Sequence, residues 1–289
     1  MVEAGNGRGC TQGVLHLSGS GDALYCMRRY SPWERLCANT QTKTVAKLPM
    51  IPTHISVSNN GMEQYFPYGE KEVTYLKSRD KRLAEMIDKV GMVKRRVIPD
   101  LFAALVHSIV GQQISTKAHE TIWRKMVDAL GEITPEVVLS LSRETLQAFG
   151  ITFKKVDYIR AAAQKIASDE FDIHALRTMD DADVCTRLSA LDGIGVWSAE
   201  MLMLFSMQRP NVLSYGDLAI QRGLRMVYHH RKIDRKLFEK YRRKFSPYCS
   251  VASLYLWAVA GGAIEGMKDY APREKSNGRK RKNTGDSKA

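Results

Sequence analysis

The sequence predicts an all-α fold for most of its 289 residues. From about Glu70 onward, apolar residues recur at helical spacing, and residues that favour helix starts and ends flank these segments. No segment of note alternates apolar and polar residues as a half-buried strand would. A hydrophobic content of 44% suits one or two globular domains with a real core.

Composition divides the chain into three regions. Residues 1–61 contain clusters of Gly, Ser, Asn and Thr without a sustained period, so we expect a disordered extension with a short strand or turn near Val14–Leu17. Helical patterning begins just after Met62, which is therefore a candidate alternative start. We expect residues 62–271 to form the helical core and residues 272–289 to be a disordered basic tail.

The first half of the core has clear helix signals. One apolar stripe is expected from Tyr75, Leu76, Leu83, Met86, Ile87 and Val90. Pro99 is expected to open the next helix, in which Leu101, Leu105 and Ile109 follow at four-residue steps. Ser115 is a plausible N-cap for a helix over 116–130 that Gly131 closes, and residues 134–136 (Thr-Pro-Glu) start another short helix.

The second half continues in the same way. Residues 153–168 carry their apolar side chains on one face, and a helix over 180–190 leads to a turn, from which a helix over 196–207 follows. Further helices are expected over 217–228, 234–245 and 249–265.

The turn between two of these helices is the most informative motif. Residues 191–199 read Leu-Asp-Gly-Ile-Gly-Val-Trp-Ser-Ala, and Asp217 follows about one helix and one loop later. Two glycines separated by one apolar residue make a tight turn that can bring backbone N–H groups against a phosphate. The turn alone is weak evidence, because many such turns only allow close helix packing.

The charge of the chain favours a polyanionic partner. The formal net charge is +13, from 44 Lys and Arg against 31 Asp and Glu. Nucleic acid is the first expectation for such a chain, and an anionic membrane is the second. Residues 271–289 contain seven basic and two acidic residues, so +5 of the excess lies there and +8 in the remainder, some of it on solvated surface.

Cysteine usage and hydropathy exclude several other classes. The five cysteines, at 10, 26, 37, 185 and 249, include no Cys-x-x-Cys pair, which argues against a disulfide framework and a zinc site. We therefore expect a reducing, intracellular compartment. There is no run of 18 apolar residues for a membrane span, and the N-terminus lacks the features of a signal peptide.

Together these motifs resemble the helix-hairpin-helix DNA glycosylase superfamily, and in particular its 3-methyladenine DNA glycosylase II type. The resemblance runs from roughly 65 to 268 and rests on four segments in order: 109–115 (Ile-Val-Gly-Gln-Gln-Ile-Ser), 149–159 with Lys154, Lys155 and Tyr158, the turn at 191–199, and Asp217-Leu218. It implies two helical lobes with the active site in the cleft between them. Asp192 stands where the family commonly has proline, and a carboxylate there weakens phosphate binding slightly.

By this resemblance Asp217 is the catalytic aspartate. Cleavage between base and sugar builds positive charge on the deoxyribose, which a fixed carboxylate stabilises, and the same group can orient or deprotonate the attacking water. The alternative is a helix N-cap, since residues 216–217 open the expected helix over 217–228, and both roles can coexist.

Trp197 predicts the reaction type. In the glycosylase/lyases of the superfamily a lysine at this position attacks the sugar and forms a Schiff base, which tryptophan cannot do. The sequence therefore predicts a monofunctional hydrolase that uses water. An indole here can stack on a flipped base and attract a cationic alkylpurine, and its alternative role is ordinary core packing.

The resemblance implies further substrate and DNA contacts. Trp257 and Tyr215 are candidates for the pocket wall and mouth, with simple packing as the alternative for Trp257. Gln112, Gln113 and Ile114 belong to the loop that enters the minor groove and fills the hole left by the extruded nucleotide, with Gln113 as the favoured plug. The alternative for this loop is a solvated turn between helices.

The turn itself is expected to bind phosphate through amides near Gly193, Ile194, Gly195 and Trp197. Family members often hold a monovalent cation under this turn on backbone carbonyls, here those of Ser189, Leu191 and Ile194. No metal ligation by side chains is implied. Only Cys249 follows the core, which excludes the four-cysteine iron–sulfur cluster of some members, and His229-His230 are expected to be a surface pair.

These observations predict a monofunctional DNA glycosylase that flips and hydrolytically excises alkylated purines of the 3-methyladenine type in base excision repair. We expect double-stranded DNA with damaged bases as the partner, no membrane, a monomer, no cofactor beyond the cation, and an intracellular, DNA-associated location in nucleoid or nucleus. The alternatives are a glycosylase/lyase for other damaged bases and a non-enzymatic helix-hairpin-helix DNA-binding protein. Asp217 and the loop at 111–115 argue against the last, because binding alone needs neither.

Overall fold

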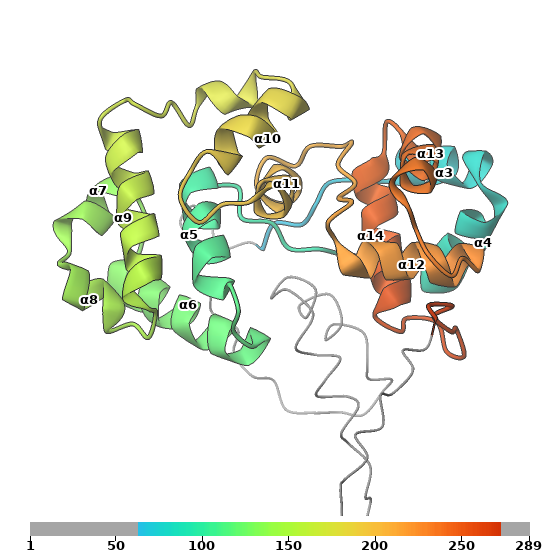
Figure 1. The fold of residues 1–289 in the computed structure, drawn as a ribbon, viewed down its shortest axis with the longest axis horizontal. Coiled ribbons are helices and arrows are strands. Elements are labelled where there is room, and N and C mark those ends of the chain that lie inside the picture. Colours follow the sequence, from blue (N-terminus) through green and yellow to red (C-terminus); the bar gives the residue numbers. More distant parts are fainter. Residues whose placement is uncertain (1–62, 273–289) are drawn as a thin grey trace, which may run out of the picture.

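The structure, a computed structural model, describes residues 63–272, which form helices joined by short segments (Figure 1). In chain order the elements are α3 (Glu70–Arg79), α4 (Lys81–Val90), α5 (Leu101–Gly111), α6 (Thr116–Leu130), α7 (Pro135–Ser140), α8 (Arg143–Gln147), α9 (Phe153–Ala167), a 3-10 helix (Ala175–Arg177), α10 (Asp181–Ser189), α11 (Val196–Phe205), α12 (Leu218–Tyr228), α13 (Arg235–Phe245) and α14 (Cys249–Ala260). The expected extension over 1–61, with its strand at Val14–Leu17, lies outside the described residues, as does almost all of 272–289.

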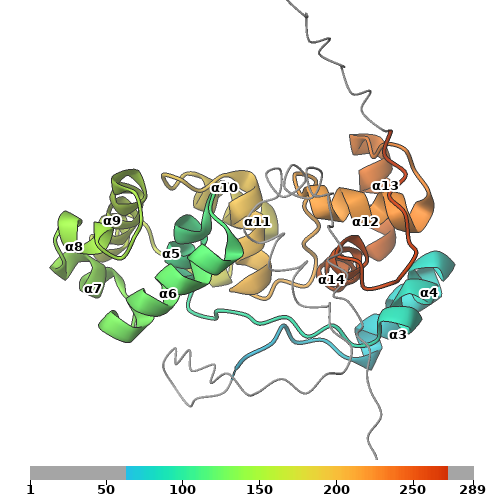
Figure 2. The same cartoon turned by 90° about the horizontal axis from the view of Figure 1, so that it is seen from below.

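The helices form two lobes, as two perpendicular views show (Figures 1 and 2). One lobe contains α5 to α11, and the other combines α3 and α4 with α12, α13 and α14. The beginning and the end of the core therefore pack together. The chain crosses between the lobes twice, after α4 and after α11. This arrangement confirms the predicted two-lobed, all-α fold.

Local capping explains where several helices begin and end. The Ser115 side chain accepts a hydrogen bond from the Ala118 N–H at 3.2 Å, and α6 ends at Gly131 with a φ of 68°. Thr134 caps α7 in the same way, with Pro135 at its first position. These ends agree with the sequence prediction to within one or two residues.

Three predicted helix boundaries were wrong. The apolar stripe over 75–90 is split into α3 and α4, because Asp80 leaves the helical conformation and caps α4 by accepting from the Leu83 N–H. Pro99 precedes α5 rather than opening it, since Asp100 is the N-cap. The last helix ends at Ala260 instead of 265, and the short α8 and the 3-10 helix were not expected.

The first crossing segment pairs with the start of the core. The Phe66 N–H donates to the Arg95 carbonyl at 2.7 Å and the Val97 N–H donates to the Gln64 carbonyl at 2.9 Å. A single antiparallel bridge, between Tyr65 and Arg96, results. Within residues 63–272, none of the helices is long and apolar enough to cross a membrane.

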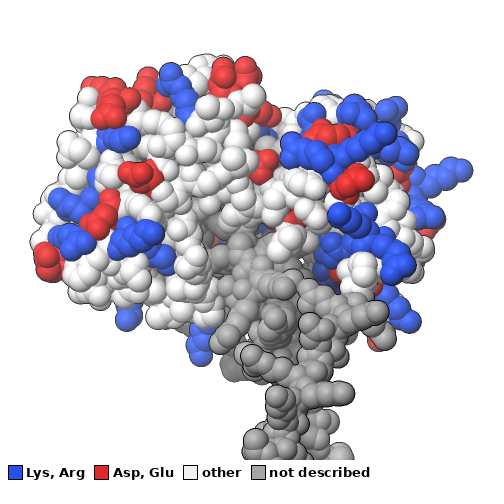
Figure 3. Space-filling model, in the orientation of Figure 1, with Lys and Arg blue, Asp and Glu red and all other residues white. Residues whose placement is uncertain are grey.

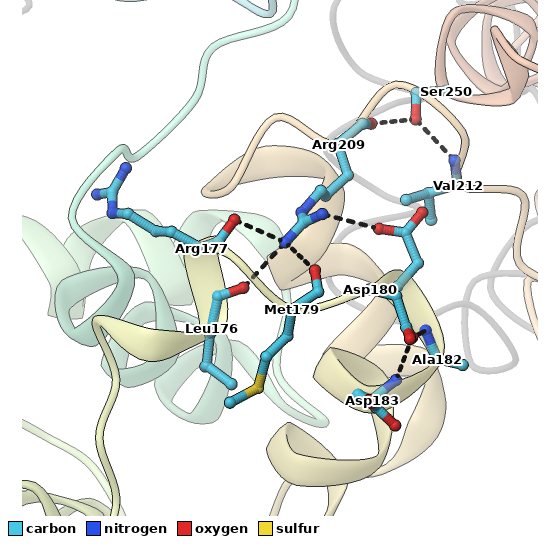
Figure 4. Close-up of polar contacts among 10 residues, drawn as sticks. Leu176, Arg177, Met179, Asp180, Ala182, Asp183, Arg209, Val212 and Ser250 are labelled. Carbon is cyan, nitrogen blue, oxygen red and sulfur yellow. Dashed lines mark hydrogen bonds and ion pairs between the residues drawn. The ribbon is translucent and has the colours of Figure 1, made fainter.

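Arg209 fixes the second crossing segment, which leads to Asp217 (Figure 4). Its Nη2 donates to the carbonyls of Leu176, Arg177 and Met179 at 2.9–3.2 Å, so it caps the end of the 3-10 helix. Its own carbonyl accepts from the Ser250 hydroxyl at 2.5 Å, and Ser250 also accepts from the Val212 N–H. Arg209 therefore ties the crossing segment to both lobes.

Close packing of α12 on α14 depends on a glycine. A Cβ at Gly223 would lie 2.4 Å from the Leu256 carbonyl oxygen, a backbone atom that cannot move aside easily. The helix that begins at Asp217 is therefore held directly against the helix that carries Trp257.

Candidate active site

The Asp217 carboxylate is buried, with 1% of the residue exposed, at the point where the second crossing segment enters α12. Oδ1 accepts from the Ile220 N–H at 2.8 Å and from the Trp257 Nε1–H at 3.1 Å. Oδ2 accepts from the Trp197 Nε1–H at 3.1 Å. Asp217 is therefore the N-cap of α12 and at the same time the centre of a network that joins α11, α12 and α14.

Burial sets the electrostatics of Asp217. It raises the pKa of the carboxyl above its ordinary value, and the hydrogen bonds from Ile220, Trp197 and Trp257 oppose this shift. A buried carboxylate that is hydrogen-bonded on both oxygens is a fixed negative charge in a low-dielectric setting, where it acts more strongly on a nearby cation than it would in water.

Trp257 contacts Asp217 through its N–H rather than through an open ring face. The residue is 2% exposed, and its ring stacks on Phe205 with centroids 5.6 Å apart. In this structure it combines core packing with positioning of the carboxylate. Its predicted place in the pocket wall stays a prediction.

Trp197 lies in the first turn of α11 and is half-buried. Its indole N–H is directed at Asp217, so the edge of the ring is anchored while the residue remains partly accessible. The predicted role of Trp197 in base stacking stays a prediction.

Tyr215 lies on the same segment two residues before Asp217. Its ring packs edge-on against Phe238 of α13, with ring centroids 5.1 Å apart. The Arg235 guanidinium also lies over this ring, 4.9 Å from the centroid. The Gln221 side chain donates to the Tyr215 carbonyl at 2.6 Å. Tyr215 is half-buried, and its predicted place at the pocket mouth stays a prediction.

Glu200 is a second carboxylate near the site that the sequence did not bring to attention. It accepts a short hydrogen bond from the buried Ser214 hydroxyl, which ties α11 to the segment before Asp217. Burial raises the pKa of Glu200, and the charge of Asp217 raises it further. Its spacing three residues after Trp197 was the available signal, since residues three apart share a helix face.

The turn between α10 and α11 has the geometry that the sequence predicts. Gly193 has a φ of 80°, and a Cβ there would lie 2.4 Å from the Tyr158 ring, so glycine is required twice over. A Cβ at Gly195 would meet nothing within 4 Å. Gly195 is the N-cap of α11 and has no side chain to accept from the first-turn amides, and Val196 beside it is 59% exposed. These amides can therefore reach an anion.

The predicted DNA loop is hydrogen-bonded to this turn. Gln112 ends α5, and its Nε2 donates to the Gly193 carbonyl at 2.7 Å. Gln113 is exposed with a left-handed φ of 55°, and Ile114 is half-buried. The structure thus brings the two predicted DNA contacts together and leaves Gln113 exposed in the loop. Its role as the plug stays a prediction.

Lys155 anchors the loop at 112–114 through the carbonyls at the end of α5. Its Nζ donates to the Val110 carbonyl at 2.8 Å and to the Gln112 carbonyl at 2.7 Å, and burial lowers its pKa. Lys154, its neighbour, instead lies over the Tyr158 ring at 5.7 Å from the centroid. Lys155 was part of the motif in the sequence, but its two carbonyl contacts depend on tertiary packing and were not predicted.

No cluster of three or more His, Cys, Asp or Glu in residues 63–272 is arranged to hold a metal ion. The carbonyls of Ser189, Leu191 and Ile194 belong to the end of α10 and the turn after it, and the Leu191 carbonyl accepts from the Ile194 N–H at 3.0 Å. Their predicted binding of a monovalent cation stays a prediction. Cys249 is buried at the start of α14 and is the one cysteine after Cys185. The expected lack of a four-thiolate cluster stays a prediction.

Comparisons with known proteins agree with this geometry. Residues 106–247 match the profile of the HhH-GPD superfamily of base excision DNA repair proteins. The crystal structure of a DNA-3-methyladenine glycosidase from Bacillus halodurans is 36% identical, with a TM-score of 0.61 over 68% of this chain and 93% of that protein. The chain belongs to the HhH-GPD superfamily. Asp217, the turn at 191–195 and the loop at 112–114 all lie within the matched residues.

A sequence comparison and a structure comparison, both with Schizosaccharomyces pombe, extend this finding. The DNA-3-methyladenine glycosylase 1 of that yeast is 26% identical over 185 residues, which cover 62% of this chain and 81% of the relative. A 3-methyladenine DNA glycosylase solved in complex with abasic DNA is 24% identical, with a TM-score of 0.59 over 68% of this chain and 98% of that one. The second likeness shows the HhH-GPD fold.

The contacts of Lys155 generate a prediction about stability. Lys155→Met should lower the free energy of unfolding by about 1–3 kcal/mol, because it leaves two carbonyls without their donor. Lys154→Met is the matched control, since this exposed neighbour makes neither hydrogen bond. Urea denaturation measures both. Equal and small effects of the two substitutions would show that Lys155 does not hold the loop.

Proposed function

We propose that this HhH-GPD protein is a monofunctional DNA glycosylase that hydrolytically removes alkylated purines from double-stranded DNA in base excision repair. One observation carries the proposal: the indole N–H of Trp197 holds the buried carboxylate of Asp217. By the family resemblance, the glycosylase/lyases have a lysine at this position. The names of the relatives, DNA-3-methyladenine glycosylases from a yeast and a bacterium, support the same substrate class.

The chemistry follows from the fixed charge. As the glycosidic bond breaks, positive charge develops on the deoxyribose, and the Asp217 carboxylate stabilises it. The two indole donors and the N-terminus of α12 keep this carboxylate oriented before reaction, so little reorganisation is needed. Water is the nucleophile, because tryptophan at 197 offers no amine.

The substrate base has to leave the duplex to reach Asp217. The amides at Gly195 and the first turn of α11 bind a phosphate of the damaged strand, and Gln113 fills the space that the base vacates. Trp197 stacks on the flipped base and favours cationic alkylpurines through cation–π attraction. Tyr215 borders the pocket mouth.

The protein acts on DNA and is DNA-associated. That it works as a monomer, without a membrane, in the nucleoid or nucleus of the cell, is part of the proposal. So is a monovalent cation on the carbonyls of Ser189, Leu191 and Ile194, where it would neutralise the phosphate side of the turn.

Asp217→Asn should reduce base release by about 100-fold or more, because it removes the charge that stabilises the sugar cation. Binding to abasic duplex should change little. Asp100→Asn is the matched control, since Asp100 caps α5 through a similar hydrogen bond away from the site. Single-turnover excision from alkylated duplex, followed by alkaline cleavage of abasic sites, measures the rates. Undiminished excision by Asp217→Asn would show that Asp217 is not the catalytic residue.

Trp197 distinguishes hydrolysis from lyase chemistry. Borohydride should trap no covalent adduct between the wild-type protein and DNA, and the product should be an intact abasic strand. Trp197→Ala should slow excision of cationic bases more than of neutral bases, by about 0.5–2 kcal/mol in the difference. Trp197→Phe keeps the ring but loses the N–H, so it should slow both classes alike. Efficient trapping of the wild-type protein would instead favour a glycosylase/lyase.

A further inference from the structure

The positive charge of the folded core is concentrated on one helix. Residues 63–272 contain 31 Lys and Arg and 26 Asp and Glu, a net charge of +5. Residues 231–244, which include most of α13, contain eight of these basic residues and two of the acidic ones, a net charge of +6. The rest of the described core, with 23 basic and 24 acidic residues, therefore has a net charge of −1.

The cations on this helix face outward together. α13 buries Phe238, Tyr241 and Phe245 against the lobe and exposes the opposite face. Figure 3 shows Lys and Arg gathered over the lobe that contains α13, whereas the other lobe carries mixed charges on this side. A solvated helix surface with such an excess of positive charge produces a local electrostatic field that attracts polyanions.

Several of these cations have no ion-pair partner among residues 63–272. Arg235 and Arg242 share Glu239, and Lys244 pairs with Asp80 at 2.5 Å. The exposed cations left without such a pair are Arg231, Lys232, Lys236, Lys240 and Arg243, and we refer to these five residues as the basic face.

The helix that carries most of the basic face, α13, begins beside the active site. Arg235, the first residue of α13, lies over the Tyr215 ring, and Phe238 packs against the same ring. At the other end, Lys244 contacts Asp80 at the start of α4. An 11-residue helix is roughly 16 Å long, so α13 extends about the length of five base pairs from the predicted mouth of the site.

The turn that is proposed to bind phosphate lies in a segment of the opposite charge. Residues 180–200 contain one basic residue, Arg187, and five acidic ones, namely Asp180, Asp181, Asp183, Asp192 and Glu200. Backbone amides can hold a single phosphate there, but the side chains around them repel the rest of the backbone. Attraction for the flanking duplex must come from elsewhere on the core.

We propose that the basic face of α13 binds the phosphate backbone of the duplex that flanks the damaged base. The inference rests on the proposed function, which makes duplex DNA the ligand. Amides of the turn hold the DNA at the lesion, and the basic face supplies the long-range attraction and the contacts with the flanking phosphates. Such contacts position the duplex without reading its sequence.

The test is the triple variant Lys236→Gln, Lys240→Gln, Arg243→Gln. Its matched control is Lys89→Gln, Arg124→Gln, Lys125→Gln, which removes the same number of exposed charges from α4 and α6. The dissociation constant for a duplex with an abasic site is measured over a range of salt concentrations. Each lost phosphate contact lowers the slope of log K against log salt by about 0.9, so the basic-face variant should lose about 2–3 and the control less than about 1.

A second measurement locates the contacts. Neutral methylphosphonate linkages are placed one at a time on either side of the lesion. They should weaken binding of the wild-type protein within about five base pairs of the lesion. In the basic-face variant only the linkage at the phosphate held by the turn should still weaken binding, and the effects at the flanking phosphates should disappear. Single-turnover excision at saturating protein should be unchanged in both variants. If the wild-type protein and both variants all fail to excise alkylated bases, the proposed function is refuted, independently of the binding results. The inference would be overturned by an unchanged salt slope in the basic-face variant or by an equal loss of slope in the control. Binding of the same variants to anionic lipid vesicles is measured in parallel, and a loss confined to the vesicles would also overturn it.

Discussion

The site depends on one buried carboxylate that three N–H groups hold in place. Asp217 accepts hydrogen bonds from its own helix at Ile220, from Trp197 at the start of α11 and from Trp257 in α14. A buried carboxylate is unfavourable unless its oxygens are satisfied, so these three helices can only pack in the arrangement that supplies the donors. Through these contacts, and through the stacking of Phe205 on Trp257, α11 and α14 meet at this point although they belong to different lobes.

A second set of contacts joins the two segments proposed to hold DNA. Gln112 bonds to the carbonyl of Gly193, and Lys155 bonds to the carbonyls that end α5. The turn and the loop therefore cannot move independently without losing hydrogen bonds. A phosphate held at α11 and a side chain inserted from the loop are consequently kept at a fixed spacing, which is what removal of a base from the stack requires.

Most helices could be predicted from the sequence because their ends carry local signals. Ser115, Thr134 and Gly131 act within one turn of their own position, so spacing alone places them. The break at Asp80 could not be predicted in this way, because an aspartate within an apolar stripe has the same local pattern whether it is exposed or buried as a cap. The family motifs singled out Asp217 and Trp197 individually, and the structure shows that they are hydrogen-bonded to each other.

What the sequence could not show depends on contacts between distant residues. Trp257 lies 40 residues after Asp217, and a tryptophan in an apolar helix gives no sign of where its N–H points. Lys155 and Glu200 likewise gain their roles from carbonyls and a hydroxyl in other segments. Net charge predicted a polyanionic partner, but its concentration over 231–244 becomes meaningful only when α13 is seen to bury one face and expose the other.

The central claim is that Asp217 is an ionised carboxylate kept so by its indole donors. Isotope-edited infrared difference spectra of the wild-type protein, with Asp217→Asn to assign the band, follow its protonation with pH. We expect a carboxylate at neutral pH that protonates on acidification above the ordinary aspartate range, because burial raises the pKa. In Trp257→Phe the pKa should rise further, so protonation should occur at higher pH. A protonated Asp217 in the wild-type protein at neutral pH, or an unchanged titration in Trp257→Phe, would contradict the account.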